Sequence, residues 1–171
     1  AYAKPLGQRV KKVGGRARHD DGLVISRAMH IEAEQTGEAI LPLTRGRVEE
    51  EIHSGKMSDL AEKIAETCRH RAEGNDVLIV ESMGHVAAGA CVGLSSAEVA
   101  QLIGSKVMIV SGGGIGRAID EIALCASYMH DRGADLMGAV VNKVWPEKYD
   151  RVKDATGKGL RRIGINPLGV V

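Results

Sequence analysis

Polar side chains of complementary chemistry follow directly after several apolar runs of the sequence. Lys4 follows the first run, Glu81 another, the glycine-rich stretch Gly112–Gly116 a third, and Asn142 with Lys143 a fourth. In an open parallel sheet, ligands bind outside the carboxyl ends of the strands, so we expect these residues to share one edge. A cation, a carboxylate, a glycine turn and an amide together predict a site for an anionic, phosphorylated ligand with a metal.

Among these residues, Glu81 has the most specific predicted role, as a ligand of Mg²⁺. A carboxylate directly after four buried aliphatic residues is costly unless it is paired or binds a metal, and Mg²⁺ takes one or two protein carboxylates beside phosphate oxygens. A strand end that emerges into water explains Glu81 equally well. Asp20 and Asp21 precede an apolar run, and they either supply a second carboxylate or cap a helix from about Gly22 to His30.

The other candidates also have ordinary structural explanations. Gly112–Gly116 is similar to a phosphate-binding turn, but it does not match G-x-G-x-x-G, and a tight turn with positive φ is slightly favoured. Asn142 offers the amide that pairs with the N6 and N7 edge of adenine, although a lone Asn at a strand end more often forms a turn. Lys4 either neutralises an anion or is a solvated lysine, and a lone His such as His85 is usually structural.

These residues need a sheet to position them and helices to cover it. Continuous apolar runs are typical of strands buried on both faces, and they predict strands at Tyr2–Ala3, Val77–Val80, Val107–Val110, Gly138–Val141 and Leu168–Val171. Apolar residues at helical spacing predict helices at Ser58–Arg71 and Arg117–Arg132. A shorter helix is expected at Ala97–Ile103 (capped by Ser95 or Ser96), and Lys148–Arg162 is a charged helix candidate. Gly7–Asp21 is expected to be a long exposed loop. The alternation predicts an α/β fold with a doubly wound, mostly parallel β-sheet flanked by helices.

Composition narrows the classes of partner. The 171 residues are 44% hydrophobic and 26% charged, which fits one soluble globular domain. The chain has 23 Lys and Arg against 22 Asp and Glu, and 2% aromatic residues. It therefore lacks the excess of basic residues and the aromatic residues that are typical of nucleic-acid-binding proteins. No apolar run reaches the roughly 20 residues of a membrane span. Three cysteines without C-x-x-C spacing predict a reducing, cytoplasmic compartment.

Taken in order, these segments resemble the dethiobiotin synthetase and cobyrinic acid a,c-diamide synthase class of P-loop NTPases. The resemblance rests on Lys4-Pro5, on Asp21 before a helix, on Val80-Glu81-Ser82-Met83-Gly84 and on Val141-Asn142-Lys143-Val144, and it covers essentially the whole chain. The chain is most similar to a branch that includes the dethiobiotin-synthetase-like domain attached to some phosphotransacetylases.

The resemblance implies ATP and Mg²⁺ as cofactors and a small acidic molecule as substrate, whose carboxyl-type group would be activated by phosphorylation. Asp21 and Glu81 would hold Mg²⁺, and Lys4 and Glu81 would act in catalysis. The nucleotide would be bound by Asn142, Lys143 and Gly84. A non-catalytic nucleotide-sensing module attached to another domain is the alternative, and a partitioning-type ATPase that dimerises on ATP shares the fold. The family often dimerises, so a homodimer is a further expectation.

Two departures from the family pattern matter. The expected Glu-Gly-x-Gly-Gly is here Glu81-Ser82-Met83-Gly84-His85, which argues against a true dethiobiotin synthetase and leaves the substrate open. No G-x-x-x-x-G-K-[ST] occurs in the 171 residues. Because the family's P-loop precedes the Lys-Pro strand, we expect a single domain over residues 1–171 that is truncated at both ends and lacks a first β-P-loop-α unit of roughly 30 residues. Whether the protein is an enzyme then depends on a Walker A motif outside these residues.

Overall fold

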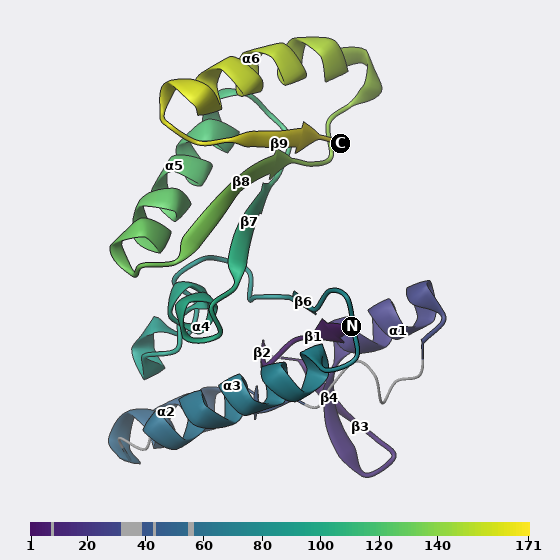
Figure 1. The fold of residues 1–171 in the computed structure, drawn as a ribbon, viewed down its shortest axis with the longest axis vertical. Helices are drawn as coiled ribbons and strands as arrows, with labels where there is room; N and C mark the ends of the chain where they lie inside the picture. The colour runs from purple at the N-terminus through teal and green to yellow at the C-terminus, as the bar shows by residue number, and fades with distance from the viewer. Residues whose placement is uncertain (8, 32–38, 43, 55–56) are drawn as a thin grey trace. The chain divides into compact units, whose positions relative to one another are not determined.

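The chain folds as two compact units, Ala1–Ile103 and Gly104–Val171, in a computed structural model that describes residues 1–7, 9–31, 39–42, 44–54 and 57–171. Each unit has a hydrophobic core of its own. Both contain parallel strands flanked by helices (Figure 1), which confirms the predicted α/β class. None of the described helices is long and apolar enough to span a membrane.

Short parallel strand pairs organise the first unit. β1 (Tyr2–Ala3) pairs with β6 (Ile79–Val80), and β2 (Leu6–Gly7) pairs with β5 (Leu41–Pro42). The helices of this unit are α1 (Asp20–Met29), α2 (Arg45–Ser54), α3 (Met57–Ala72) and α4 (Ser96–Leu102), with the 3-10 turn η2 (Ala90–Val92) before α4. Side chains from β2, α3, η2 and α4 fill the core: Leu6, Ile64, Cys68, Val92, Leu94 and Val99.

The predicted loop over Gly7–Asp21 is wrong, because β3 (Val10–Val13) and β4 (Arg16–His19) form an antiparallel hairpin there. Gly14 and Gly15 have φ angles of 57° and 79°, and two successive residues with positive φ are what a two-residue hairpin turn requires. The many basic side chains of this stretch conceal the strand pattern. The hairpin matters for the site because β4 leads directly into α1.

Helix α1 begins two residues before the predicted start at Gly22, and its N-cap residue is His19. Asp20 and Asp21 therefore lie in the first turn and do not cap the helix. Carboxylates in a first turn face the positive end of the helix dipole and stabilise the helix. Both carboxylates therefore lie at the N-terminal end of α1.

The second unit is a three-stranded parallel sheet with two helices. Its strands are β7 (Lys106–Ser111), β8 (Asp135–Val141) and β9 (Pro167–Val170), in the order β7-β8-β9. Its helices are α5 (Gly116–Asp131) and α6 (Tyr149–Arg162), with the 3-10 turn η3 (Pro146–Lys148) before α6. Both helices pack with β8 in the core: Ala118, Ile122, Ala139, Val141, Val152, Leu160 and Ile165.

Burial on both faces, expected for these strands, is not found within the second unit. Met108 and Val110 alternate along β7 with more buried residues, and they are 50% and 55% exposed. The unit's two helices contact the opposite face of the sheet, which carries Ile109, Ala139 and Val141. Within this unit, therefore, only one face of the sheet is well covered.

The helices predicted at Ser58–Arg71, Ala97–Ile103, Arg117–Arg132 and Lys148–Arg162 are confirmed within one residue at each end as α3, α4, α5 and α6. Ser95 caps α4 in a capping box: its hydroxyl accepts from the Glu98 N–H, and its own N–H donates to the Glu98 carboxylate at 2.6 Å. Helix α2 was not predicted, because its sequence has only two large apolar residues, Val48 and Ile52, among charged neighbours.

Candidate functional site

Lys4 and Glu81 leave the same edge of the β1–β6 pair. In this parallel register Ala3 lies opposite Val80, so the next residue of each strand comes to the same end. The Glu81 N–H donates to the Ala3 carbonyl at 2.8 Å, which continues the pairing beyond the strands. The Lys4 ammonium then donates to Glu81 Oε1 at 2.7 Å. The structure thus places these two predicted site residues in direct contact.

Asp21 reaches the same ammonium from the first turn of α1. Lys4 Nζ lies 2.6 Å from Asp21 Oδ2. His19, the residue before α1, packs closely against Gly7 of β2. A Cβ added at Gly7 would lie only 2.7 Å from Nδ1 of the buried His19 ring. This close approach requires glycine at position 7. Lys4 therefore bridges two carboxylates that come from distant segments of the chain.

Tyr2 is a member of this site that the sequence-based reasoning missed. Its hydroxyl donates to Glu81 Oε2 at 2.6 Å, and the residue is only 6% exposed. Side chains two residues apart on a strand point to the same face, so Tyr2 and Lys4 project together from β1. That spacing is the signal that could have found it. Tyr2, Lys4, Asp21 and Glu81 are called the Lys4 cluster below.

Burial and charge act in opposite directions on Lys4, whose side chain is 10% exposed. Burial is the largest single influence and lowers the pKa, but the hydrogen bonds and charges of Asp21 and Glu81 together outweigh it, so the pKa of Lys4 is raised. The hydrogen bond from Lys4 is the main reason that the pKa of Asp21 is lowered. Burial, followed by the hydrogen bond to Glu81, raises the pKa of the Tyr2 hydroxyl. At neutral pH, Lys4 is thus a stable cation and Tyr2 a stable donor.

The loop after Glu81 is tied to the start of α4. The Ser82 hydroxyl donates to the Ser96 hydroxyl, and Ser96 contacts the carbonyl of His85 at 3.4 Å. Gly84 lies exposed in this loop, and a Cβ there would meet none of the described atoms within 4 Å. The expected role of Gly84 in nucleotide binding stays a prediction.

Asn142 and Lys143 follow β8 in the second unit, beside the glycine-rich turn. The Asn142 N–H donates to the Ser111 carbonyl, and Asn142 Oδ1 accepts from the Lys143 N–H at 2.8 Å. Lys143 has a φ of 62°, and a Cβ at Gly113 would lie 2.7 Å from the Lys143 carbonyl oxygen. Gly114 has a φ of 131°, which confirms the tight-turn interpretation there. A joint site with the residues of the first unit stays a prediction.

Comparison with known proteins assigns the family. A family model described as an AAA domain matches residues 1–169. The chain belongs to the AAA domain family. This family consists of P-loop NTPases, and the match extends over both units.

One curated relative of this AAA domain is the ATP-dependent dethiobiotin synthetase of Saccharopolyspora erythraea. It is 26% identical over 147 residues, and the match covers 81% of this chain. The chain spans 62% of the length of that relative. This match confirms the predicted similarity to the dethiobiotin synthetase class. The similarity to cobyrinate enzymes stays a prediction.

The oxygen atoms of the Lys4 cluster suit Mg²⁺ in an AAA domain. P-loop NTPases hold this ion partly through an acidic residue, and Glu81 is an acidic residue directly after β6. The burial expected for the strand before Glu81 is not found, because Val77 and Ile79 are both 63% exposed. The Lys4 ammonium shows that Asp21 and Glu81 can each present an oxygen to one cation, and their side chains are 54% and 40% exposed. Mg²⁺ needs one or two carboxylates beside phosphate oxygens. Over the described residues, no three His, Cys, Asp or Glu side chains gather as a metal site.

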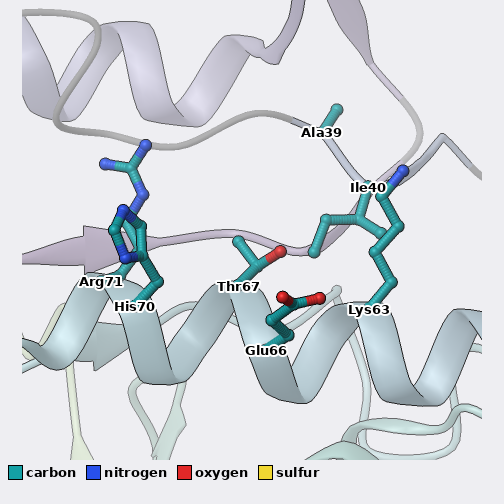
Figure 2. Close-up of a pocket in the computed structure, with 7 residues that line it drawn as sticks. All are labelled: Ala39, Ile40, Lys63, Glu66, Thr67, His70 and Arg71. Atoms are coloured by element: carbon teal, nitrogen blue, oxygen red, sulfur yellow. The ribbon is translucent and has the colours of Figure 1, made fainter.

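A separate pocket of about 290 Å³ lies on the outer side of α3. Figure 2 shows five side chains of α3 along it, facing the segment that leads into β5; its lining residues are Ala39, Ile40, Lys63, Glu66, Thr67, His70 and Arg71. This lining mixes cationic, anionic and apolar side chains. None of the site residues predicted from the sequence belongs to it, so it is distinct from the Lys4 cluster.

Proposed function

We propose that the chain binds ATP with Mg²⁺ as part of a dethiobiotin synthetase-like ligase that activates a carboxyl-type group by phosphorylation. The observation that carries the proposal is the Lys4 ammonium, held 2.6 Å from Asp21 and 2.7 Å from Glu81 at the carboxyl end of parallel strands. The family assignment and the ATP-dependent relative support a nucleotide as the ligand.

Each member of the Lys4 cluster has a role in this proposal. Asp21 and Glu81 would hold Mg²⁺, which would neutralise charge on the phosphates when bound. Lys4 would offer its fixed positive charge to an oxygen of the γ-phosphate or of the substrate carboxylate. Tyr2 would keep Glu81 in place. Phosphoryl transfer depends mainly on positioning and charge neutralisation, and these residues supply both.

The nucleotide base would be bound by the second unit. Asn142 Oδ1 accepts one hydrogen bond from the Lys143 N–H, and an amide oxygen can accept a second. Its NH₂ group could donate to N7 of adenine while Oδ1 accepts from N6. Lys143 and Gly84 would contribute to nucleotide binding, and the substrate would be a small acidic molecule.

The test is Mg²⁺-dependent ATP turnover by the full-length protein, with small carboxylic acids and amines as substrates. Glu81→Gln should lower kcat/KM by about 100-fold, because a carboxylate that holds the metal is lost. Asp154→Asn is the control: Asp154 pairs with the exposed Lys158 within α6 of the second unit, and its loss should leave turnover unchanged. Unchanged turnover in Glu81→Gln would contradict the proposal.

A nucleotide-sensing module is the second candidate. It is favoured by the loop after Glu81, where Ser82 replaces an expected glycine and is hydrogen-bonded to Ser96. This bond ties the loop to the first residue of α4. Titration of the full-length protein with ATP separates the candidates: tight binding without turnover across all candidate acids supports the sensor.

A further inference from the structure

We propose that Tyr2 is a positioning residue that makes the Lys4 cluster prefer Mg²⁺ over Ca²⁺, by holding Glu81 to one-oxygen contact with a cation. The inference rests on the proposed function, because the cation concerned is the one that accompanies ATP. It assigns to a buried tyrosine a role that neither the family match nor the relative's name describes.

The two oxygens of Glu81 have partners of different kinds. Oε1 faces the ammonium of Lys4 at 2.7 Å, and Oε2 accepts from the hydroxyl of Tyr2 at 2.6 Å. The Tyr2 ring is buried and its backbone lies in β1, opposite Ile79 of β6. The packed ring therefore keeps the hydroxyl in a fixed position beside Oε2. The hydrogen bond from Tyr2 therefore fixes the orientation of the Glu81 carboxylate, with Oε1 directed at the position that the Lys4 ammonium occupies.

This arrangement discriminates between the two common hard cations. Mg²⁺ demands near-octahedral geometry at about 2.0–2.1 Å, whereas Ca²⁺ takes 6–8 oxygens at about 2.3–2.6 Å and often binds a carboxylate through both oxygens. A carboxylate oxygen that accepts one hydrogen bond can still bind a cation, so Tyr2 acts through orientation. It keeps Oε1 toward the cation, which suits the single-oxygen contact of Mg²⁺, and it hinders the rotation that would bring both oxygens to a Ca²⁺ ion. Without the hydroxyl, the carboxylate is free to rotate and can turn both oxygens toward one cation.

The experiment measures binding and needs no turnover. Isothermal titration calorimetry on the full-length protein gives the affinities for Mg·ATP and Ca·ATP in wild type, Tyr2→Phe and Tyr149→Phe. Wild type should prefer Mg·ATP. In Tyr2→Phe the affinity for Mg·ATP should fall about 10-fold, as expected when a group that orients a metal ligand is removed, while the affinity for Ca·ATP is kept or rises. Tyr149→Phe, which removes a hydroxyl bonded to the Val170 carbonyl in the second unit, should leave the preference unchanged.

The outcomes separate this inference from the proposed function. If wild type binds neither Mg·ATP nor Ca·ATP, both fail. If wild type binds Mg·ATP but Tyr2→Phe keeps the same Mg²⁺-to-Ca²⁺ ratio, or weakens both equally, the role of Tyr2 is overturned and the proposed function stands. Circular dichroism checks the fold of Tyr2→Phe, which loses one oxygen atom.

Discussion

The two units position their candidate site residues by different physical means. In the first, four side chains from β1, α1 and the end of β6 hold one another through charge and short hydrogen bonds. In the second, the glycine-rich turn and the Asn142–Lys143 segment are fixed by close backbone approach, with Gly113 against the Lys143 carbonyl. The first arrangement depends on ionisation, whereas the second depends on shape. Substitutions should therefore respond to pH in the first unit and hardly at all in the second.

Gly113→Ala should have the largest effect on stability. Its Cβ would lie 2.7 Å from the Lys143 carbonyl oxygen and 3.2 Å from the carbonyl carbon, and backbone atoms cannot move aside as a flexible side chain can. We expect a loss of about 3 kcal/mol in the free energy of unfolding. Urea denaturation followed by the fluorescence of Trp145, the single tryptophan, reports on this unit.

The control for this substitution is Gly112→Ala, because a Cβ at Gly112 would meet none of the described atoms within 4 Å. The difference between the two variants should be the same at pH 5 and pH 8. Equal stability of the two variants would show that the turn does not contact the Asn142–Lys143 segment.

Lys4→Met should have the next largest effect, and this one should depend on pH. It leaves the carboxylates of Asp21 and Glu81 facing each other without a cation, which costs about 2 kcal/mol. The loss should shrink below about pH 4, where carboxylates become protonated. The rate at which the buried Cys68 thiol of α3 is labelled, followed by mass spectrometry, measures opening of the first unit.

Lys106→Met is the control for Lys4→Met, and because Lys106 lies in the second unit its effect is measured by urea denaturation followed by Trp145 fluorescence. Lys106 also lies 2.9 Å from a carboxylate, that of Asp135, but both side chains are more than 60% exposed. Exposed pairs of this kind contribute about 0.2–1 kcal/mol. If Lys4→Met is no more costly than Lys106→Met, burial does not strengthen the Lys4 cluster.

The smallest effect concerns the ionisation of Asp21. The hydrogen bond from Lys4 lowers the pKa of this carboxyl below its usual 3.8, so its contribution to stability is complete above that pH and is lost as the pH falls through the lowered value. The effect is small because the Asp21 side chain is half exposed. An NMR titration of the Asp21 carboxyl should give a pKa below 3.8 in wild type and a higher one in Lys4→Met. Identical values would contradict the pairing.

Helices and strands whose apolar residues repeat at a regular spacing could be predicted from the sequence. Those whose positions are mostly charged could not, because they lack an apolar repeat. The apolar spacing within α3 and α5 identifies both helices. The hairpin β3–β4 was missed because lysines and arginines occupy its strands, and its Gly14-Gly15 turn was the available signal. The spacing of residues within a strand does not identify the strand with which it pairs.

The site was predictable in so far as it follows from strand ends. Lys4 and Glu81 meet because the carboxyl ends of parallel neighbours share an edge, and this rule needs no coordinates. Two features could not be derived. One is that a single ammonium bridges Asp21 and Glu81, because the position of α1 depends on the hairpin. The other is the bond from Tyr2, which lies within a strand and not at its end.

The most direct test of the central claim, that the Lys4 cluster holds the metal that accompanies ATP, is a crystal structure of the full-length protein with ATP and Mn²⁺. Mn²⁺ accepts the same oxygen ligands as Mg²⁺ and can be located by its anomalous scattering. The account predicts an anomalous peak about 2 Å from a carboxylate oxygen of Asp21 or Glu81, with Lys4 turned toward a phosphate or carboxylate oxygen. A peak elsewhere, with Lys4 still between the two carboxylates, would contradict it.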